Sequence, residues 1–171
     1  MSDVSVSQDG PRGMITLKGD LADLSSAVTS ATGCAMPGRR AMTQAQGRAV
    51  AWMAPDEVLI LCDHAEVGNL VMQLSDALVD QTHLAVDVSD ARALFTLDGP
   101  GAREVLARLS PTDQRGLEPG EMRRTRMAQV PAAVWFNSST QAQVICFRSV
   151  ATYMHDILHA ATRSTMLTGQ S

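Results

Sequence analysis

The stretch HLAVDVSDARALFTLDGPGAREVLARLS, residues 83–110, holds the clearest secondary-structure pattern in the chain. Its first part is a run that favours a strand, with Leu84, Val86 and Val88 at every second position, and a polar break over residues 89–92 separates it from a second apolar run. Asp98-Gly99-Pro100 ends that second run, and the apolar residues after it recur at helical spacing up to Leu109. The stretch therefore predicts a strand, a polar interruption, a second strand and a helix.

The order of elements repeats in two halves of the chain. Thr16-Leu17-Lys18-Gly19 matches Thr96-Leu97-Asp98-Gly99, and Trp52 matches Trp135, at an offset of about 80 residues. In each half a strand leads to a helix, then to a hairpin and a second helix. The strands expected after the first strand of each half cover residues 41–53, 58–62, 124–136 and 143–147, and the helices cover residues 21–31, 67–78 and 102–109 and begin again at Ser149.

This long internal period predicts two copies of one supersecondary unit that bury their apolar faces together. We expect an α+β fold, a duplicated βαββα module with antiparallel sheets covered by helices. Residues 14–163 are predicted to form a single domain with two similar halves, about 14–80 and 83–163. A mobile N-terminal arm over residues 1–13 and a frayed tail over residues 164–171 are expected to flank it.

Composition excludes several classes of protein. The 171 residues are 45% hydrophobic and 19% charged, which is typical of a soluble globular protein, and no apolar run approaches the roughly 18–20 residues of a membrane span. The polar N-terminus does not resemble a secretory signal, so a cytoplasmic protein is expected. A net charge of −4 and 4% aromatic residues give no footprint for nucleic acid, and three widely spaced cysteines do not predict a disulfide framework.

The motifs that could carry chemistry are weak. His155 and His159 have the spacing of two zinc ligands on a helix, but no third ligand accompanies them. Cys62 falls on a predicted core strand while His64 begins a helix, which does not make a nucleophile and its base. Gly99-Pro100-Gly101 lacks the downstream glycine of a dinucleotide-binding loop. We therefore predict no catalytic residue, no cofactor-binding residue and no metal ligand on this chain.

Charged residues in two places, together with Arg148, form a candidate partner interface. On a strand, Arg124 and Arg126 would share one face and could clamp carboxylates of a partner protein or a polyglutamyl chain, or could simply be a solvated face. The central polar break could be a polar contact point, or its side chains could satisfy the turn. The candidate interface residues are Asp87, Asp90, Arg92, Arg123, Arg124, Arg126 and Arg148.

Four segments, in order along the chain, closely resemble the gamma subunits of heterotetrameric sarcosine oxidase. They are VDVSDARA (86–93), LDGPGAREVL (97–106), PGEMRRTRMAQ (119–129) and RSVATY (148–153). The earlier LKGDL (17–21) and WMAPDE (52–57) agree as well, so that the resemblance covers about residues 14–160. Gamma subunits of related N-methyl amino acid oxidases and dehydrogenases are the nearest confusable members.

A broader pattern, Asp-Val-Ser, then Gly-Pro-x-Ala, then a helix, is similar to the folate-binding module of aminomethyltransferases, the glycine-cleavage T-protein class. This likeness implies an aminomethyltransferase folate-binding-domain-like fold. At about half the length of those transferases, the chain is expected to lack the additional domains that complete their folate pocket.

The resemblance implies a noncatalytic structural or assembly subunit of a flavoenzyme complex. Such complexes oxidise sarcosine to glycine, pass the one-carbon unit to tetrahydrofolate or release it as formaldehyde, and reduce oxygen to peroxide. By resemblance, FAD, FMN, NAD and tetrahydrofolate are held by the alpha and beta subunits and zinc by the delta subunit, which makes these three chains the expected partners. The alternatives are a free-standing folate-binding protein of the aminomethyltransferase type, or the gamma subunit of a related N-methyl amino acid oxidase or dehydrogenase.

Overall fold

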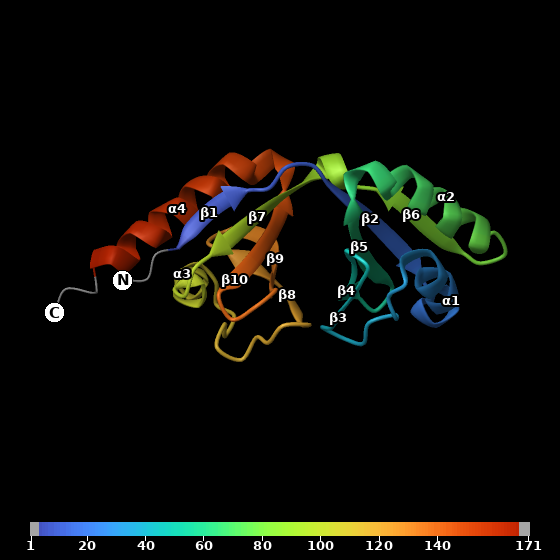
Figure 1. The fold of residues 1–171 in the computed structure, drawn as a ribbon, viewed down its shortest axis with the longest axis horizontal. Coiled ribbons are helices and arrows are strands. Elements are labelled where there is room, and N and C mark those ends of the chain that lie inside the picture. Colours follow the sequence, from blue (N-terminus) through green and yellow to red (C-terminus); the bar gives the residue numbers. More distant parts are fainter. Residues whose placement is uncertain (1–3, 168–171) are drawn as a thin grey trace. The chain divides into compact units, whose positions relative to one another are not determined.

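The computed structural model describes residues 4–167, and side chains as far as residue 163 (Figure 1). It divides the chain into two compact units. The N-terminal unit is Pro11–Asp90, and the C-terminal unit consists of Ala91–Ser171 together with Met1–Gly10. Each unit holds one five-stranded antiparallel sheet and two helices.

The N-terminal unit is built on a sheet with the strand order β3-β4-β5-β2-β6. Its helices α1 and α2 pack against one face of the sheet and enclose a core that includes Ile15, Leu17 and Ile60. Asp20 caps the first helix by accepting a hydrogen bond from the Ala22 N–H, and Gly33 ends it with a φ of 75°. The elements are β2 (Arg12–Gly19), α1 (Leu21–Thr32), β3 (Met42–Ala45), β4 (Arg48–Ala54), β5 (Glu57–Asp63), the short 3-10 helix η1 (His64–Glu66), α2 (Val67–Ala77) and β6 (His83–Asp87).

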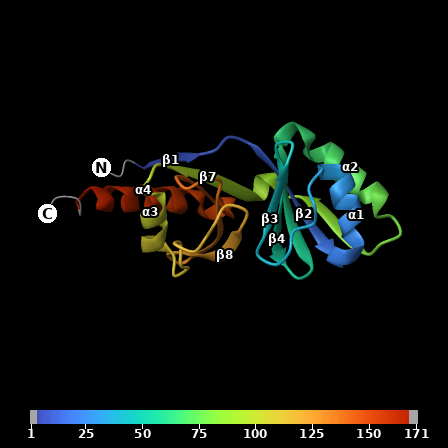
Figure 2. The same cartoon turned by 60° about the horizontal axis from the view of Figure 1, so that its bottom comes forward.

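The C-terminal unit repeats this arrangement with the strand order β8-β9-β10-β7-β1. Helices α3 and α4 cover one face of its sheet (Figure 2). Phe95, Val134 and Leu158 lie in the core of this unit. Its elements are β1 (Ser5–Gln8), β7 (Arg92–Asp98), α3 (Ala102–Leu109), β8 (Met122–Met127), β9 (Val130–Phe136), β10 (Gln141–Phe147), η3 (Arg148–Val150) and α4 (Ala151–Leu167). The short 3-10 helix η2 (Ser89–Ala91) spans the point in the chain where the N-terminal unit ends and the C-terminal unit resumes.

The two units exchange their edge strands. Strand β1 precedes β2 in the chain but pairs with β7, and β6 precedes β7 but pairs with β2. The exchange is symmetric down to single hydrogen bonds, because Asp9 N–H donates to the Leu94 carbonyl at 2.9 Å as Val88 N–H donates to the Met14 carbonyl at 2.8 Å. The mobile arm expected over residues 1–13 is therefore wrong for residues 5–8 and 12–13, which are strand. Residues 1–3 lie outside the described residues.

The α+β class, the antiparallel sheets and the duplication are confirmed, but each module is larger than βαββα. Residues 41–53 and 124–136, each expected as one strand, are hairpins formed by β3 with β4 and by β8 with β9. The chain reverses where Gln46 and Gly47 have φ values of 52° and 76°, and where Ala128 has a φ of 52°. Each module is thus βαβββα plus one exchanged edge strand.

The two hairpins differ in length. In the first hairpin, two residues separate the paired Ala45 and Arg48. In the second, the equivalent pair is Thr125 and Ala132, and the six residues 126–131 lie between them, so the second hairpin has an insertion of four residues. The insertion shifts the offset between the repeats beyond this point. Trp52 therefore corresponds to Phe136, and the match of Trp52 to Trp135 expected from the sequence is wrong by one residue.

The C-terminal helix is longer than expected. Helix α4 continues to Leu167, so residues 164–167 are helical and do not belong to a frayed tail. Residues 168–171, the rest of the expected tail, lie outside the described residues. Among the described residues, no helix combines the length and apolarity needed to cross a membrane.

Candidate partner interface

The arginines of β8 lie on an edge strand of the C-terminal sheet, and two of them face away from the helices. Arg124 and Arg126 are exposed and lie on the same face, as predicted. Arg123 points to the opposite face and is partly buried, where it forms an ion pair of 3.2 Å with Glu121. Arg126 donates a hydrogen bond of 3.0 Å to the Gln129 carbonyl within its own hairpin.

Arg92 and Arg148 meet at the end of the same sheet around an exposed aromatic ring. Arg92 begins β7 and is directly opposite Phe147, the last residue of β10, and its guanidinium lies 5.7 Å from the Phe147 ring centroid. Arg148 donates a hydrogen bond of 2.7 Å to the Arg92 carbonyl. Phe147 is 52% exposed, which is unusual for a phenylalanine.

The strand register places these groups in one row. Ala93, Cys146, Ala132 and Thr125 are paired across β7, β10, β9 and β8. The residues one step further along each strand are Arg92, Phe147, Pro131 and Arg126, and they occupy the face without helices. We call these four residues the arginine row. Sequence reasoning found its two arginines but missed Phe147 and Pro131, because exposure at a sheet end depends on the fold.

The two aspartates of the central break belong to the N-terminal unit, and Asp87 has a structural role. Its carboxylate accepts hydrogen bonds from the Ser89 N–H at 2.9 Å and the Ser89 hydroxyl at 2.5 Å. The hydroxyl bond from Ser89 is the main reason why the pKa of Asp87 is lowered. The Ser89 oxygen in turn accepts from the buried Met14 N–H at 3.0 Å. Asp87 therefore satisfies the turn, which was one of the two alternatives, while Asp90 is exposed on η2.

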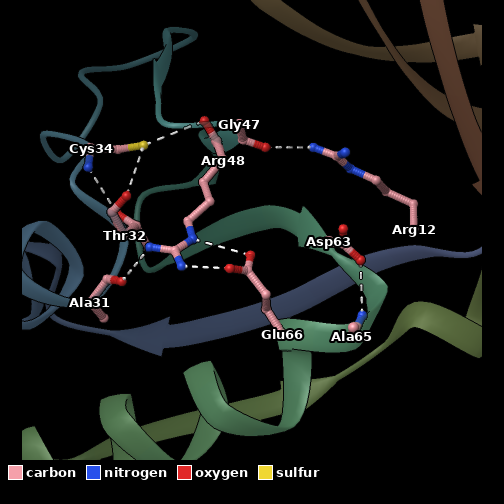
Figure 3. Close-up of polar contacts among 9 residues, drawn as sticks. All are labelled: Arg12, Ala31, Thr32, Cys34, Gly47, Arg48, Asp63, Ala65 and Glu66. Carbon is pink, nitrogen blue, oxygen red and sulfur yellow. Dashed lines mark hydrogen bonds and ion pairs between the residues drawn. The ribbon is translucent and has the colours of Figure 1, made fainter.

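A polar cluster in the N-terminal unit was not predicted (Figure 3). Arg48 on β4 forms an ion pair of 2.8 Å with Glu66 at the start of α2, and a hydrogen bond of 3.2 Å to the Ala31 carbonyl near the end of α1. The hydrogen bond from Arg48 lowers the pKa of Glu66, and the same contact raises that of Arg48. Its partners are all groups of the same unit, so the cluster joins three elements and its charges are already paired.

The cysteines and histidines named in the sequence analysis are not arranged as a nucleophile with its base or as a pair of metal ligands with a third. Burial raises the pKa of Cys62 and of Cys146 to about 11, which keeps both sulfurs protonated at neutral pH. The rings of His155 and His159 lie 4.3 Å apart, and His155 contacts Asp156 at 3.2 Å. Among the described residues, no group of three or more His, Cys, Asp or Glu side chains is placed to hold a metal ion.

The glycine segment before α3 does not have the donors of a phosphate loop. Gly99 N–H donates to the Thr140 carbonyl and Ala102 N–H donates to the Gly99 carbonyl, at 2.9 and 3.1 Å. Pro100 has no N–H to offer. These residues therefore use their amides to turn the chain from β7 into α3.

Comparison with known proteins gives the family. Residues 18–163 match the family model described as sarcosine oxidase, gamma subunit family. The chain is 32% identical over 114 residues to sarcosine oxidase subunit gamma of Corynebacterium sp. (strain U-96), which covers 64% of this chain and 55% of that protein. It is 33% identical over 93 residues to sarcosine oxidase subunit gamma from Arthrobacter sp., which covers 53% of this chain and 45% of that protein. The matched part thus spans about half the length of these curated relatives.

The fold is shared with two kinds of solved structure. A chain of heterotetrameric sarcosine oxidase from Corynebacterium sp. U-96 in complex with pyrrole 2-carboxylate superposes with a TM-score of 0.86 at 23% identity, covering 94% of this chain and 84% of that one. Glycine cleavage system aminomethyltransferase T from Bartonella henselae superposes with a TM-score of 0.71 at 10% identity, covering 92% and 45%. Both likenesses support the fold expected from the sequence. Because the family model matches well over half of its length, this chain belongs to the sarcosine oxidase gamma subunit family.

Proposed function

We propose that this chain is a noncatalytic assembly subunit of a heterotetrameric flavoenzyme complex that oxidises sarcosine to glycine. The observation that carries the proposal is the family match over residues 18–163. The likeness to a chain of heterotetrameric sarcosine oxidase supports it at the level of the fold.

The chemistry of the described residues is consistent with a scaffold. Glu66 is held by Arg48, Asp87 is held by Ser89, and burial keeps the Cys62 thiol protonated. Groups used in this way stabilise the protein and are not poised to attack or protonate a substrate. The reacting groups of the complex are therefore assigned to other subunits.

The partners that we propose are an alpha, a beta and a delta subunit. FAD, FMN, NAD and tetrahydrofolate would be held by the alpha and beta chains and zinc by the delta chain, in a complex located in the cytoplasm. These cofactors would supply the oxidation of the N-methyl group, the reduction of oxygen and the transfer of the one-carbon unit. The part of this chain would be to hold the other subunits in place.

The arginine row is our candidate for the docking surface. An exposed phenylalanine beside guanidinium groups is the composition found at the centre of protein interfaces, where Arg and aromatic residues are enriched. The partner segment that fits it would combine apolar side chains for Phe147 with carboxylates for Arg92 and Arg126. The four-residue insertion that brings Pro131 and Arg126 to this row has no counterpart in the other repeat.

Co-expression tests the proposal. All four subunits should give a stable flavin-containing assembly, and Phe147→Ser combined with Arg126→Glu should reduce its yield on the order of tenfold if these residues anchor the interface. Arg39→Glu, at an exposed position of the N-terminal unit, is the matched control. An equally active complex formed without this chain would refute the assembly role, and normal assembly of the double variant would refute the docking surface alone.

A second candidate function is free-standing folate binding, which is favoured by the structural likeness to aminomethyltransferase T. Titration of the isolated chain with a reduced folate separates the two. Saturable micromolar binding would support the folate-binding function, whereas the assembly role predicts no saturable binding of folate by the chain alone.

A further inference from the structure

Strand β6 leaves one side of its backbone without a strand partner. It is the last strand of the N-terminal sheet and pairs only with β2 among the described residues. Because Val88 N–H bonds to the Met14 carbonyl, the alternation of an antiparallel pair turns the N–H and C=O groups of Val86 and Leu84 toward β2 as well. The backbone groups of His83, Ala85 and Asp87 therefore point outward.

The side chains of β6 do not protect this edge. Leu84 and Val86 are 52% and 39% exposed and share the face without helices, while Ala85 packs on the core. Natural edge strands are usually blunted by charged side chains, above all lysine, by proline or by a bulge. Residues 83–87 contain no lysine, proline or bulge, and the carboxylate of Asp87 is bound to Ser89. The equivalent edge strand of the other repeat, β1, has Ser5 and Ser7 in the places of Leu84 and Val86. The apolar edge is thus a property of β6 and not of the repeated fold.

The sequence of β6 is complementary to itself in antiparallel order. If two copies of HLAVD pair about the central alanine, Ala85 lies opposite Ala85, Leu84 opposite Val86 and His83 opposite Asp87. Apolar side chains then meet on one face, and an imidazole meets a carboxylate at each end of the other. The outward groups of His83, Ala85 and Asp87 would form six backbone hydrogen bonds across the pair.

We propose that β6 is a docking edge for a second copy of this chain, in an antiparallel β6–β6 pair centred on Ala85. An extended strand matches the alternating donors and acceptors of the edge. A second copy supplies that strand together with the apolar and charged pairs in the same register. This inference does not rest on the proposed function.

Disulfide trapping tests the register directly. The two Ala85 positions would be a hydrogen-bonded pair with Cα atoms about 5.5 Å apart, within the range of a disulfide. Mild oxidation of the purified Ala85→Cys chain should therefore yield covalent dimer on the order of ten times more than Ser7→Cys, its control on the exposed part of β1. The native Cys34, Cys62 and Cys146 are buried and do not compete.

Light scattering across a concentration series supplies the second readout. The wild-type chain should approach twice the monomer mass, and Leu84→Ser with Val86→Ser, which copies the serines of β1, should raise the dimer Kd by at least about tenfold. A wild-type chain that remains monomeric, or a dimer that the double variant leaves unchanged, would overturn the proposal. In a co-expressed complex, an Ala85→Cys thiol that cross-links only to another subunit would also overturn it, while leaving the assembly role intact.

Discussion

The guanidinium of Arg48 binds the carboxylate of Glu66 through two hydrogen bonds, 2.8 Å from Nη2 to Oε1 and 3.3 Å from Nε to Oε2. A third bond, from Nη1 to the Ala31 carbonyl, extends the contact to α1. One side chain on β4 therefore connects the end of the first helix with the beginning of the second.

Replacing Arg48 by methionine should destabilise the protein. The substitution keeps an apolar stem but removes all three hydrogen bonds, and we expect a loss of roughly 1 kcal/mol because the contact is partly exposed. Urea unfolding measures the loss. Arg39→Met removes an exposed arginine from the same unit and should change the midpoint little; equal midpoints for the two variants would contradict the role of Arg48.

The same pair gives stability a dependence on pH. The hydrogen bond from Arg48 lowers the pKa of Glu66 below its ordinary value of 4.5 in the folded protein, so the pair contributes stability above pH 4.5. That contribution is lost as the pH falls through the lowered pKa. The urea midpoints of wild type and Glu66→Gln should differ most near neutral pH and converge in acid. A difference between the two urea midpoints that grows as the pH falls would contradict a lowered pKa for Glu66.

Ser89→Ala should weaken the contact between strand β2 and the turn that follows β6, within the N-terminal unit. The hydroxyl accepts from the buried Met14 N–H and donates to Asp87, so its removal leaves a buried donor unpaired, at a cost of about 1–3 kcal/mol. Hydrogen exchange at the Met14 amide reports the effect locally. Asp87→Asn keeps the hydroxyl bond to Met14 and should therefore protect that amide better than Ser89→Ala does; the opposite order would exclude this arrangement.

The contribution of the sequence to the fold differs from element to element. Helix α1 was predictable because Asp20 and Gly33 mark its two ends, and in each helix the spacing of the apolar residues marks the buried face. The exchanged strand β1 was not, since SVSQ has weak patterning and its partner Thr96 is far away in the sequence. The hairpin turn at Ala128-Gln129 uses a non-glycine residue with positive φ, which no turn motif indicates.

The N-terminal repeat should not tolerate alanine at Gly13, although the other repeat has alanine at the equivalent position, Ala93. Gly13 pairs with Cys62 as Ala93 pairs with Cys146, yet a Cβ on Gly13 would come within 2.6 Å of the Cys62 sulfur and 2.7 Å of the Asp63 carbonyl oxygen. Gly13→Ala should therefore destabilise the protein by about 1–3 kcal/mol through overpacking. Thermal unfolding measures it. An unchanged or raised unfolding temperature for Gly13→Ala would contradict this prediction, because it would mean that the added methyl group fits without a clash.

The candidate interface was predictable only in part. Alternation along a strand was enough to place Arg124 and Arg126 on one face. The grouping of Arg92 with Phe147 required the register between β7 and β10, and the structural role of Asp87 required the position of Ser89. The Arg48–Glu66 pair joins residues on different elements and left no local signal.

The most direct measurement is native mass spectrometry of the assembly purified through a tag on this chain after co-expression with alpha, beta and delta subunits. The account predicts a flavin-containing complex that holds all four kinds of chain. Recovery of this chain without them, while the other three form a fully active complex, would contradict it.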